Sequence, residues 1–88
     1  MRALVKAVYP FKELKYEKVK TFVLILVNKQ EVKWYDNGKK PFNIKTKDGS
    51  FREASKGDII DGIVVHDTGV INYTRCNPNL VNEQLTIL

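Results

Sequence analysis

The feature that most constrains this chain is a succession of short β-branched and aromatic runs separated by turn sequences. The segment Thr21–Val27 is an unbroken aliphatic and β-branched run, which is typical of a strand covered on both faces. No segment repeats apolar residues at the spacing of a long amphipathic helix. The pattern therefore predicts six or seven short strands in an all-β, or nearly all-β, fold whose sheet edges are hidden by closure or by a second sheet.

Turn chemistry sets the expected connections between these strands. The dipeptide Asn37-Gly38 is a strong hairpin signal because both residues tolerate a positive φ, and it predicts a hairpin from Glu31 to Lys47. The sequence Asp67-Thr68-Gly69 predicts another hairpin turn. A glycine inside the run Ile59–Val65, Gly62, predicts a bulge or a sharp bend. Residues 11–20 fit either a short helical turn or a twisted, exposed strand.

The length of 88 residues predicts one domain, 1–88, with one modest core. Cys76 is the only cysteine, so no internal disulfide is expected and a reducing compartment, the cytoplasm, is the expected location. The longest apolar run, Phe22–Val27, is far shorter than the roughly 20 residues of a membrane-spanning helix. We therefore expect no signal peptide and no membrane helix.

The charge of the chain is unevenly distributed. Residues 1–56 hold 14 of the 15 basic residues and six of the ten acidic ones, a net charge of +8. Residues 57–88 hold one basic and four acidic residues, a net charge of −3. This asymmetry indicates either a surface for a polyanion or an ordinary solvated face rich in lysine.

Catalytic and metal-binding chemistry find little support in the sequence. One cysteine and one histidine are too few for a zinc site within one chain. The carboxylates near His66 match no calcium loop and are typical of turns. Neither Ser50 nor Ser55 lies in a nucleophile-elbow sequence, and no glycine-rich loop is present to hold a phosphate. We expect a binding protein rather than an enzyme, with no metal, no cofactor and no small-molecule substrate.

The segment 31–47 is the strongest candidate for a binding site. On the predicted hairpin, basic, amide and aromatic side chains share the outward face, and we expect Arg52 to flank them. Single-stranded nucleic acid is bound in this way, because lysines neutralise phosphates while aromatic rings stack on bases. Trp34 and Phe42 are expected in the core. The candidate binding residues are Lys33, Tyr35, Lys39, Lys40, Asn43, Lys45, Lys47 and Arg52.

The sequence Val32-Lys33-Trp34-Tyr35-Asp36-Asn37, followed by Lys40-Pro41-Phe42-Asn43-Ile44, resembles the opening of cold-shock domains. Pro41 and Asn43 stand where that family's aromatic motif has glycines. The resemblance implies a small OB-like barrel, as an alternative to a compact sandwich of short antiparallel strands. It also implies that Lys33, Trp34 and Phe42 contact bases or backbone, which conflicts with the core positions expected above.

The segment 77–88 is apolar enough to need a packing partner. It carries five large aliphatic residues after the breaker Asn77-Pro78-Asn79. The segment either closes this fold or mediates a homodimer or higher oligomer.

The function that these patterns favour is binding of single-stranded DNA or RNA with little sequence preference. The alternative is a small protein-interaction, assembly or inhibitor module of a virus or mobile element.

Overall fold

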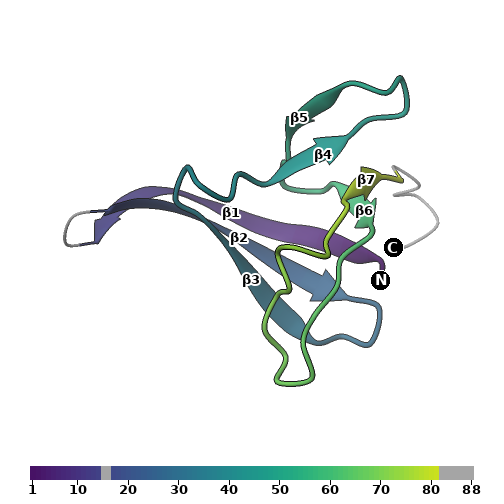
Figure 1. The fold of residues 1–88 in the computed structure, drawn as a ribbon, viewed down its shortest axis with the longest axis horizontal. Coiled ribbons are helices and arrows are strands. Elements are labelled where there is room, and N and C mark those ends of the chain that lie inside the picture. The colour runs from purple at the N-terminus through teal and green to yellow at the C-terminus, as the bar shows by residue number, and fades with distance from the viewer. Residues whose placement is uncertain (15–16, 82–88) are drawn as a thin grey trace.

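A single curled sheet of seven strands makes up the regular structure of the part of the chain that the structure describes (Figure 1). The computed structural model describes residues 1–14 and 17–81, including the side chains of residues 1–9 and 18–81. All regular elements within these ranges are strands. They are β1 (Ala3–Leu14), β2 (Glu17–Leu26), β3 (Glu31–Asp36), β4 (Asn43–Lys45), β5 (Phe51–Glu53), β6 (Ile59–Asp61) and β7 (Asn79–Leu80).

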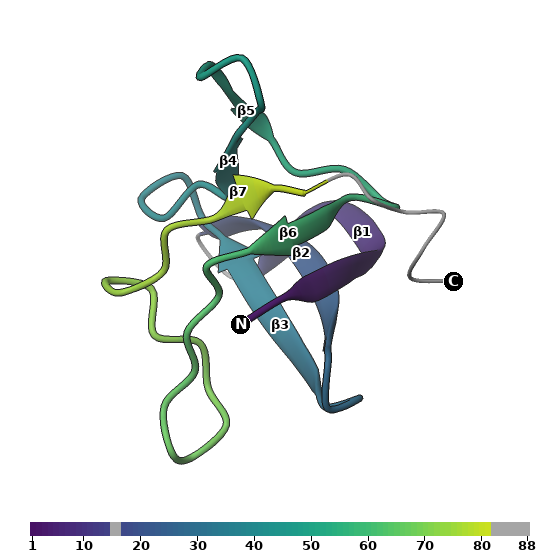
Figure 2. The ribbon, with the colours of Figure 1, turned by 90° about the vertical axis from the view of Figure 1, so that its right-hand side faces the viewer.

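The strands lie in the order β3-β2-β1-β6-β7-β4-β5. Neighbouring strands are antiparallel except β4 and β7, which are parallel. Figures 1 and 2 show the sheet bending, so that β4 and β5 stand at an angle to β1, β2 and β3. The result is an all-β half-barrel, which confirms the predicted fold class.

The interior of the half-barrel is filled from both ends of the sheet. Trp34 on β3 stacks on Phe42, which directly precedes β4, with ring centroids 4.2 Å apart. Phe22 on β2 makes an edge-to-face contact with the same phenylalanine, with ring centroids 5.1 Å apart. The first and the sixth strand in the sheet order therefore share one core, and the sheet must curl to bring their rings together.

The predicted buried strand within residues 21–27 is confirmed by β2. Phe22 and Leu24 are fully buried, and Leu26 is 2% exposed. The buried run ends there, because Val27 begins a turn and is 67% exposed. The open question about residues 11–20 is also settled, since residues 11–14 belong to β1 and residues 17–20 to β2, its antiparallel partner.

The predicted hairpin from Glu31 to Lys47 is wrong. β3 pairs with β2, whereas β4 pairs with β5 and β7. The Asn-Gly signal makes a local turn instead: the side chain of Asp36 accepts a bond from Gly38 N, and that of Asn37 from Lys39 N. Burial of Phe42 favours this path, because the chain that leaves β3 and crosses to the other end of the sheet places the ring fully in the core, stacked on Trp34.

Gly62 bends the chain as predicted and divides the run 59–65. Its φ is +90°, and a β-carbon there would lie 2.1 Å from the carbonyl oxygen of Asn77. The strand therefore ends at Asp61, and the rest of the run continues as a loop. The predicted turn at residues 67–69 is confirmed by a bridge between Val65 and Ile71. This loop returns the chain to the groove described below.

The predicted C-terminal segment is described as far as residue 81. β7 lies between β6 and β4, and Leu80 packs against the core. The first part of the segment thus closes this fold. The expectation of self-association through the remaining aliphatic residues falls on residues 82–88, which lie outside the described residues.

Candidate nucleic-acid interface

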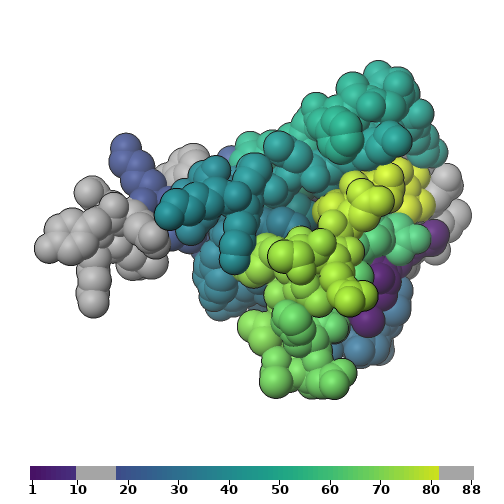
Figure 3. Space-filling view, in the orientation of Figure 1, coloured from purple at the N-terminus to yellow at the C-terminus, as the bar shows by residue number. Residues whose placement is uncertain are grey.

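A groove of about 520 Å³ lies between the β3–β4 connection, the β4–β5 hairpin and the segment 73–78. Figure 3 shows this face, with teal side chains of residues near 40 bordering yellow-green side chains of the segment in the seventies. Two lysines and no carboxylate are among the described residues that form it. We call this the basic groove; its lining is Trp34, Lys39, Lys40, Pro41, Asn43, Phe51, Tyr73, Thr74, Cys76, Asn77 and Pro78.

The indole of Trp34 anchors the inner wall of the basic groove. Its Nε1 donates a hydrogen bond of 2.9 Å to the carbonyl oxygen of Lys40, and its ring stacks on Phe42 and makes an edge-to-face contact with Tyr73. Trp34 is 5% exposed and Phe42 is fully buried. The core positions expected for both rings are confirmed. Base contacts by these two rings, which the cold-shock resemblance implied, conflict with this burial.

Tyr73 connects the groove to the edge of the sheet. Its hydroxyl oxygen accepts a hydrogen bond from the backbone nitrogen of Tyr35, with a separation of 3.3 Å. The ammonium group of Lys40 lies 4.5 Å from the centre of the Tyr73 ring, within the range of a cation–π contact. A half-buried aromatic ring and a lysine are therefore held together at the groove.

The outer face of the β4–β5 hairpin extends this surface. Ile44 points into the core, whereas Asn43 and Lys45 are exposed. Lys45 lies directly opposite Phe51 on β5, so the two side chains share one face of the sheet. Phe51 is 68% exposed. An ammonium group and an uncovered aromatic ring therefore stand next to each other beside the basic groove.

The structure separates the remaining predicted residues of β3 from this groove. Lys33 and Tyr35 alternate with the buried Trp34, so they lie on the outer face of the half-barrel. Tyr35 is 50% exposed, and its cross-strand neighbour is Thr21. Lys47 is exposed in the turn after β4. The single site predicted from sequence is thus divided. Lys39, Lys40 and Asn43 line the groove and Lys45 lies beside it, opposite Phe51, whereas Lys33 and Tyr35 lie on another face.

Arg52 has a structural partner. Its Nη1 and Nη2 donate hydrogen bonds to the two carboxylate oxygens of Asp58 at 2.8 and 2.9 Å, and Nη1 also donates to the carbonyl oxygen of Glu53. The hydrogen bond with Asp58 raises the pKa of the guanidinium above its usual value. The same carboxylate accepts a bond from Ser55 N. Arg52 therefore fixes the β5–β6 connection, and we remove it from the candidate binding residues.

The turn between β4 and β5 contains an acidic group that stays ionised. The carboxylate of Asp48 accepts hydrogen bonds from the hydroxyls of Ser50 and Thr46 and from Ser50 N. These bonds, led by that of the Ser50 hydroxyl, lower the pKa of Asp48 from 3.8 to about 2. The turn is thereby held in one shape and positions the hairpin that carries Lys45 and Phe51.

Cys76 lines the groove but has the surroundings of a structural thiol. Its sulfur donates to the carbonyl oxygen of Val64 and accepts from Val64 N. Burial raises the pKa of this thiol above 9.0, so it is protonated at neutral pH. Within residues 1–14 and 17–81, no group of three or more histidine, cysteine or carboxylate residues is arranged to hold a metal ion. Among the same residues, no helix is long and apolar enough to cross a membrane.

Sequence reasoning missed Phe51 and Tyr73, the two rings that face the groove. For Phe51 the available signal was the short run of residues that follows the Asp48-Gly49 turn. In this run the small residue Ala54, and not Phe51, enters the core. Tyr73 gave no such signal, because it lies in a turn outside any strand. Comparisons with protein-family models, curated proteins and solved structures found no match to this chain.

Proposed function

We propose that this protein binds single-stranded DNA or RNA, with little sequence preference, through the basic groove and the adjoining outer face of β4 and β5. The observation that carries the proposal is the groove itself. It combines Tyr73 and the exposed Phe51 with two lysines, and no carboxylate is among its described lining residues. No residue there is assigned a catalytic role.

The two kinds of side chain have separate tasks in this proposal. Lys39, Lys40 and Lys45 contact phosphates, and the counterions released from the nucleic acid supply affinity without reading sequence. Phe51 and Tyr73 offer ring surface on which bases stack, worth about 1 to 3 kcal/mol for each base. Both contributions tolerate any base, because every base has a flat face and every nucleotide a phosphate.

Single strands fit this surface better than a duplex. The faces of the bases in a duplex are covered by their neighbours, so they can stack on protein rings only after unpairing. The volume of about 520 Å³ lies within the range of roughly 300 to 1,000 Å³ found for pockets that hold small molecules. The groove therefore suits an unpaired nucleotide, with the strand continuing along Lys45.

One observation favours the alternative, a protein-interaction or assembly module. β5 is the last strand in the sheet order, and among the described residues it pairs only with β4. An extended peptide adds to such an edge by main-chain hydrogen bonds. The exposed Phe51 would then contact a side chain of the partner instead of a base.

A fluorescence titration with oligo(dT) distinguishes the two functions. Trp34 lies in the wall of the groove, so its emission reports a ligand bound there. With three lysine contacts to a single strand, we expect log K to fall with log salt at a slope of about −2. A duplex of the same length should bind more weakly. Absence of oligo(dT) binding at low salt, up to high micromolar concentration, would instead favour the protein-interaction module.

A further inference from the structure

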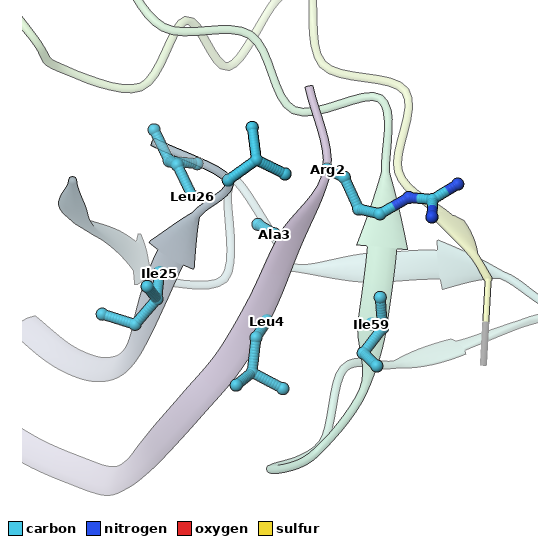
Figure 4. Close-up of a pocket in the computed structure, with 7 residues that line it drawn as sticks. Arg2, Ala3, Leu4, Ile25, Leu26 and Ile59 are labelled. Atoms are coloured by element: carbon cyan, nitrogen blue, oxygen red, sulfur yellow. The ribbon is translucent and has the colours of Figure 1, made fainter. Parts of the chain in front are cut away.

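The chemistry of the basic groove is not repeated in a second hollow of about 400 Å³, which lies where β1, β2 and β6 meet (Figure 4). That hollow is lined by Arg2 and six apolar residues, of which Ala3 and Leu26 belong to the buried core cluster. Its described lining contains no aromatic ring. In the basic groove, by contrast, Lys40 and Tyr73 both line the wall and contact each other. The contact between these two side chains therefore bears on which ligands the basic groove admits.

The ammonium group of Lys40 covers a face of the Tyr73 ring. Its nitrogen lies over the ring, 4.5 Å from the ring centre. A stacked ring occupies the same space, as the stack of Trp34 on Phe42 shows, with ring centroids 4.2 Å apart. The ammonium group and a base therefore cannot lie on this face of Tyr73 at the same time.

The contacts around this pair fix the ring and the backbone but not the lysine side chain. Tyr73 is held by the hydrogen bond from Tyr35 N to its hydroxyl oxygen and by the edge-to-face contact with Trp34. The carbonyl oxygen of Lys40 is held by Trp34 Nε1. Lys40 is exposed, and in the part of the chain that the structure describes no carboxylate lies within ion-pair distance of its ammonium group. The ammonium group can therefore leave the ring by rotation of its flexible four-carbon stem, without a change in the backbone.

We propose that Lys40 determines which ligands stack on Tyr73. Its ammonium group covers the ring in the free protein and leaves it for a phosphate of the incoming strand, whose base then takes its place on the ring. This inference rests on the proposed function, because it joins two contacts of that function, the phosphate contact of Lys40 and the base contact of Tyr73, in one exchange.

The exchange selects ligands by their chemistry. A neutral aromatic molecule offers no anion to the ammonium group, so it displaces the cation–π contact without compensation and binds about 2- to 5-fold more weakly than to an uncovered ring. A nucleotide carries a ring and an anion together. Nucleotides are therefore the class of ligand that the pair of Lys40 and Tyr73 admits.

Proton NMR on the full chain follows the exchange directly. In the free protein, the ε-methylene protons of Lys40 should resonate upfield of those of Lys39, because an aromatic ring shields protons that lie over its face. Saturating oligo(dT) should move the Lys40 signals downfield to the position of the Lys39 signals. Binding of oligo(dT) with the Lys40 signals unchanged would overturn the exchange and leave the proposed function standing. Equal positions of the two lysines in the free protein would overturn the covering contact, and absence of oligo(dT) binding would overturn both this inference and the proposed function.

A matched pair of lysine variants gives an independent readout. Lys40→Ala and Lys39→Ala each remove one phosphate contact, so each should flatten the salt slope by about 0.7. Only Lys40→Ala also uncovers the Tyr73 ring. At about 1 M salt, where counterion release no longer contributes to affinity, Lys40→Ala should bind oligo(dT) about 2- to 5-fold more tightly than the unmodified chain, whereas Lys39→Ala should equal it. Binding by Lys40→Ala that is no tighter than binding by Lys39→Ala at this salt concentration would contradict the proposal.

Discussion

At the scale of single residues, Tyr73 shows how one side chain can organise a surface. Its hydroxyl accepts a hydrogen bond from a backbone nitrogen at the edge of β3, its ring makes an edge-to-face contact with Trp34, and the ammonium group of Lys40 lies over the ring. Phe51 is the opposite case. It is 68% exposed, and it lines the groove from β5, where it lies opposite Lys45. Because its ring contributes little to the core, Phe51 is the better residue for testing binding without disturbing the fold.

Phe51→Ala should weaken oligo(dT) binding roughly 5- to 150-fold, as expected for one lost stacking contact of about 1 to 3 kcal/mol. The salt slope should hardly change, because an aromatic ring releases no counterions. Fluorescence titration at several salt concentrations measures both quantities. Tyr35→Ala is the matched control, since it removes an exposed ring from the outer face. If the control costs as much affinity as Phe51→Ala, the binding surface is the face of β3 and not the groove.

Asp48 gives a prediction about pH. Its pKa in the folded chain is about 2, below its ordinary value of 3.8. Because the pKa of Asp48 is lower in the folded chain than in the unfolded one, its ionised carboxylate stabilises the fold. This contribution to stability is present above about pH 3.8 and is lost as the pH falls toward 2. An NMR titration of the Asp48 carboxyl group should show the low midpoint, and Ser50→Ala should move it upward because the largest cause of the shift is removed. A midpoint near 3.8 in the unmodified chain would show that the hydrogen bonds of this turn are not maintained in solution.

At the scale of elements, the connections decide where each strand goes. β3 and β4 are separated by only six residues, yet they lie at positions one and six in the sheet order. Three contacts hold this connection: the Asp36 and Asn37 side-chain bonds to the turn and the Trp34 Nε1 bond to the Lys40 carbonyl oxygen. The connection thereby becomes a wall of the basic groove instead of a hairpin tip.

Gly62→Ala should be more destabilising than Gly49→Ala by at least about 1 kcal/mol. Both glycines have a positive φ, +90° and +88°, so both substitutions strain the backbone to a similar degree. A β-carbon at Gly62 would also lie 2.1 Å from the Asn77 carbonyl oxygen, whereas one at Gly49 would meet nothing within 4 Å. Equilibrium denaturant unfolding measures the difference. Equal losses would mean that the backbone of residues 62 and 77 approaches less closely than the structure shows.

At the scale of the whole molecule, the sheet order joins the two electrically different parts of the chain. Residues 1–56 carry a net charge of +8 and residues 57–88 carry −3. β7 comes from the acidic part but lies against β4 from the basic part, with Lys45 opposite Asn79. The basic groove accordingly takes its lysines from one part and Tyr73, Asn77 and Pro78 from the other. The charge of the groove therefore depends on which residues the fold places together, and not on the net charge of the chain.

Lys39→Ala with Lys45→Ala should weaken oligo(dT) binding and flatten the salt slope by about 1.4, the value expected when two contacts to a single strand are lost. The control is Lys6→Ala with Lys56→Ala, which removes the same charge from exposed positions outside the groove. The control should change the salt slope little, because distant charges attract only through a field that salt screens over about 10 Å at 0.1 M. Equal effects of the two pairs would indicate diffuse attraction without a defined site.

The sequence by itself determined the features that depend on local pattern. The unbroken run after Thr21 predicted the buried strand, Gly62 predicted the bend, and the burial of Trp34 and Phe42 followed from their size and apolar character. Strand alternation also predicted which side chains are exposed, because this prediction requires only that the strand and its buried face are assigned correctly. The side chains concerned are Lys33, Tyr35, Asn43 and Lys45.

Only the tertiary structure decided which strands pair, because pairing depends on the combined burial of residues distant in sequence. The Asn37-Gly38 signal is compatible with a hairpin, but the free energy gained by packing Phe42 between Phe22 and Trp34 outweighs a local turn preference. The same long-range packing brings Tyr73 and Phe51 to the lysines of the groove. A local sequence pattern describes one segment at a time, whereas the candidate site is formed from three segments that meet only when the sheet curls.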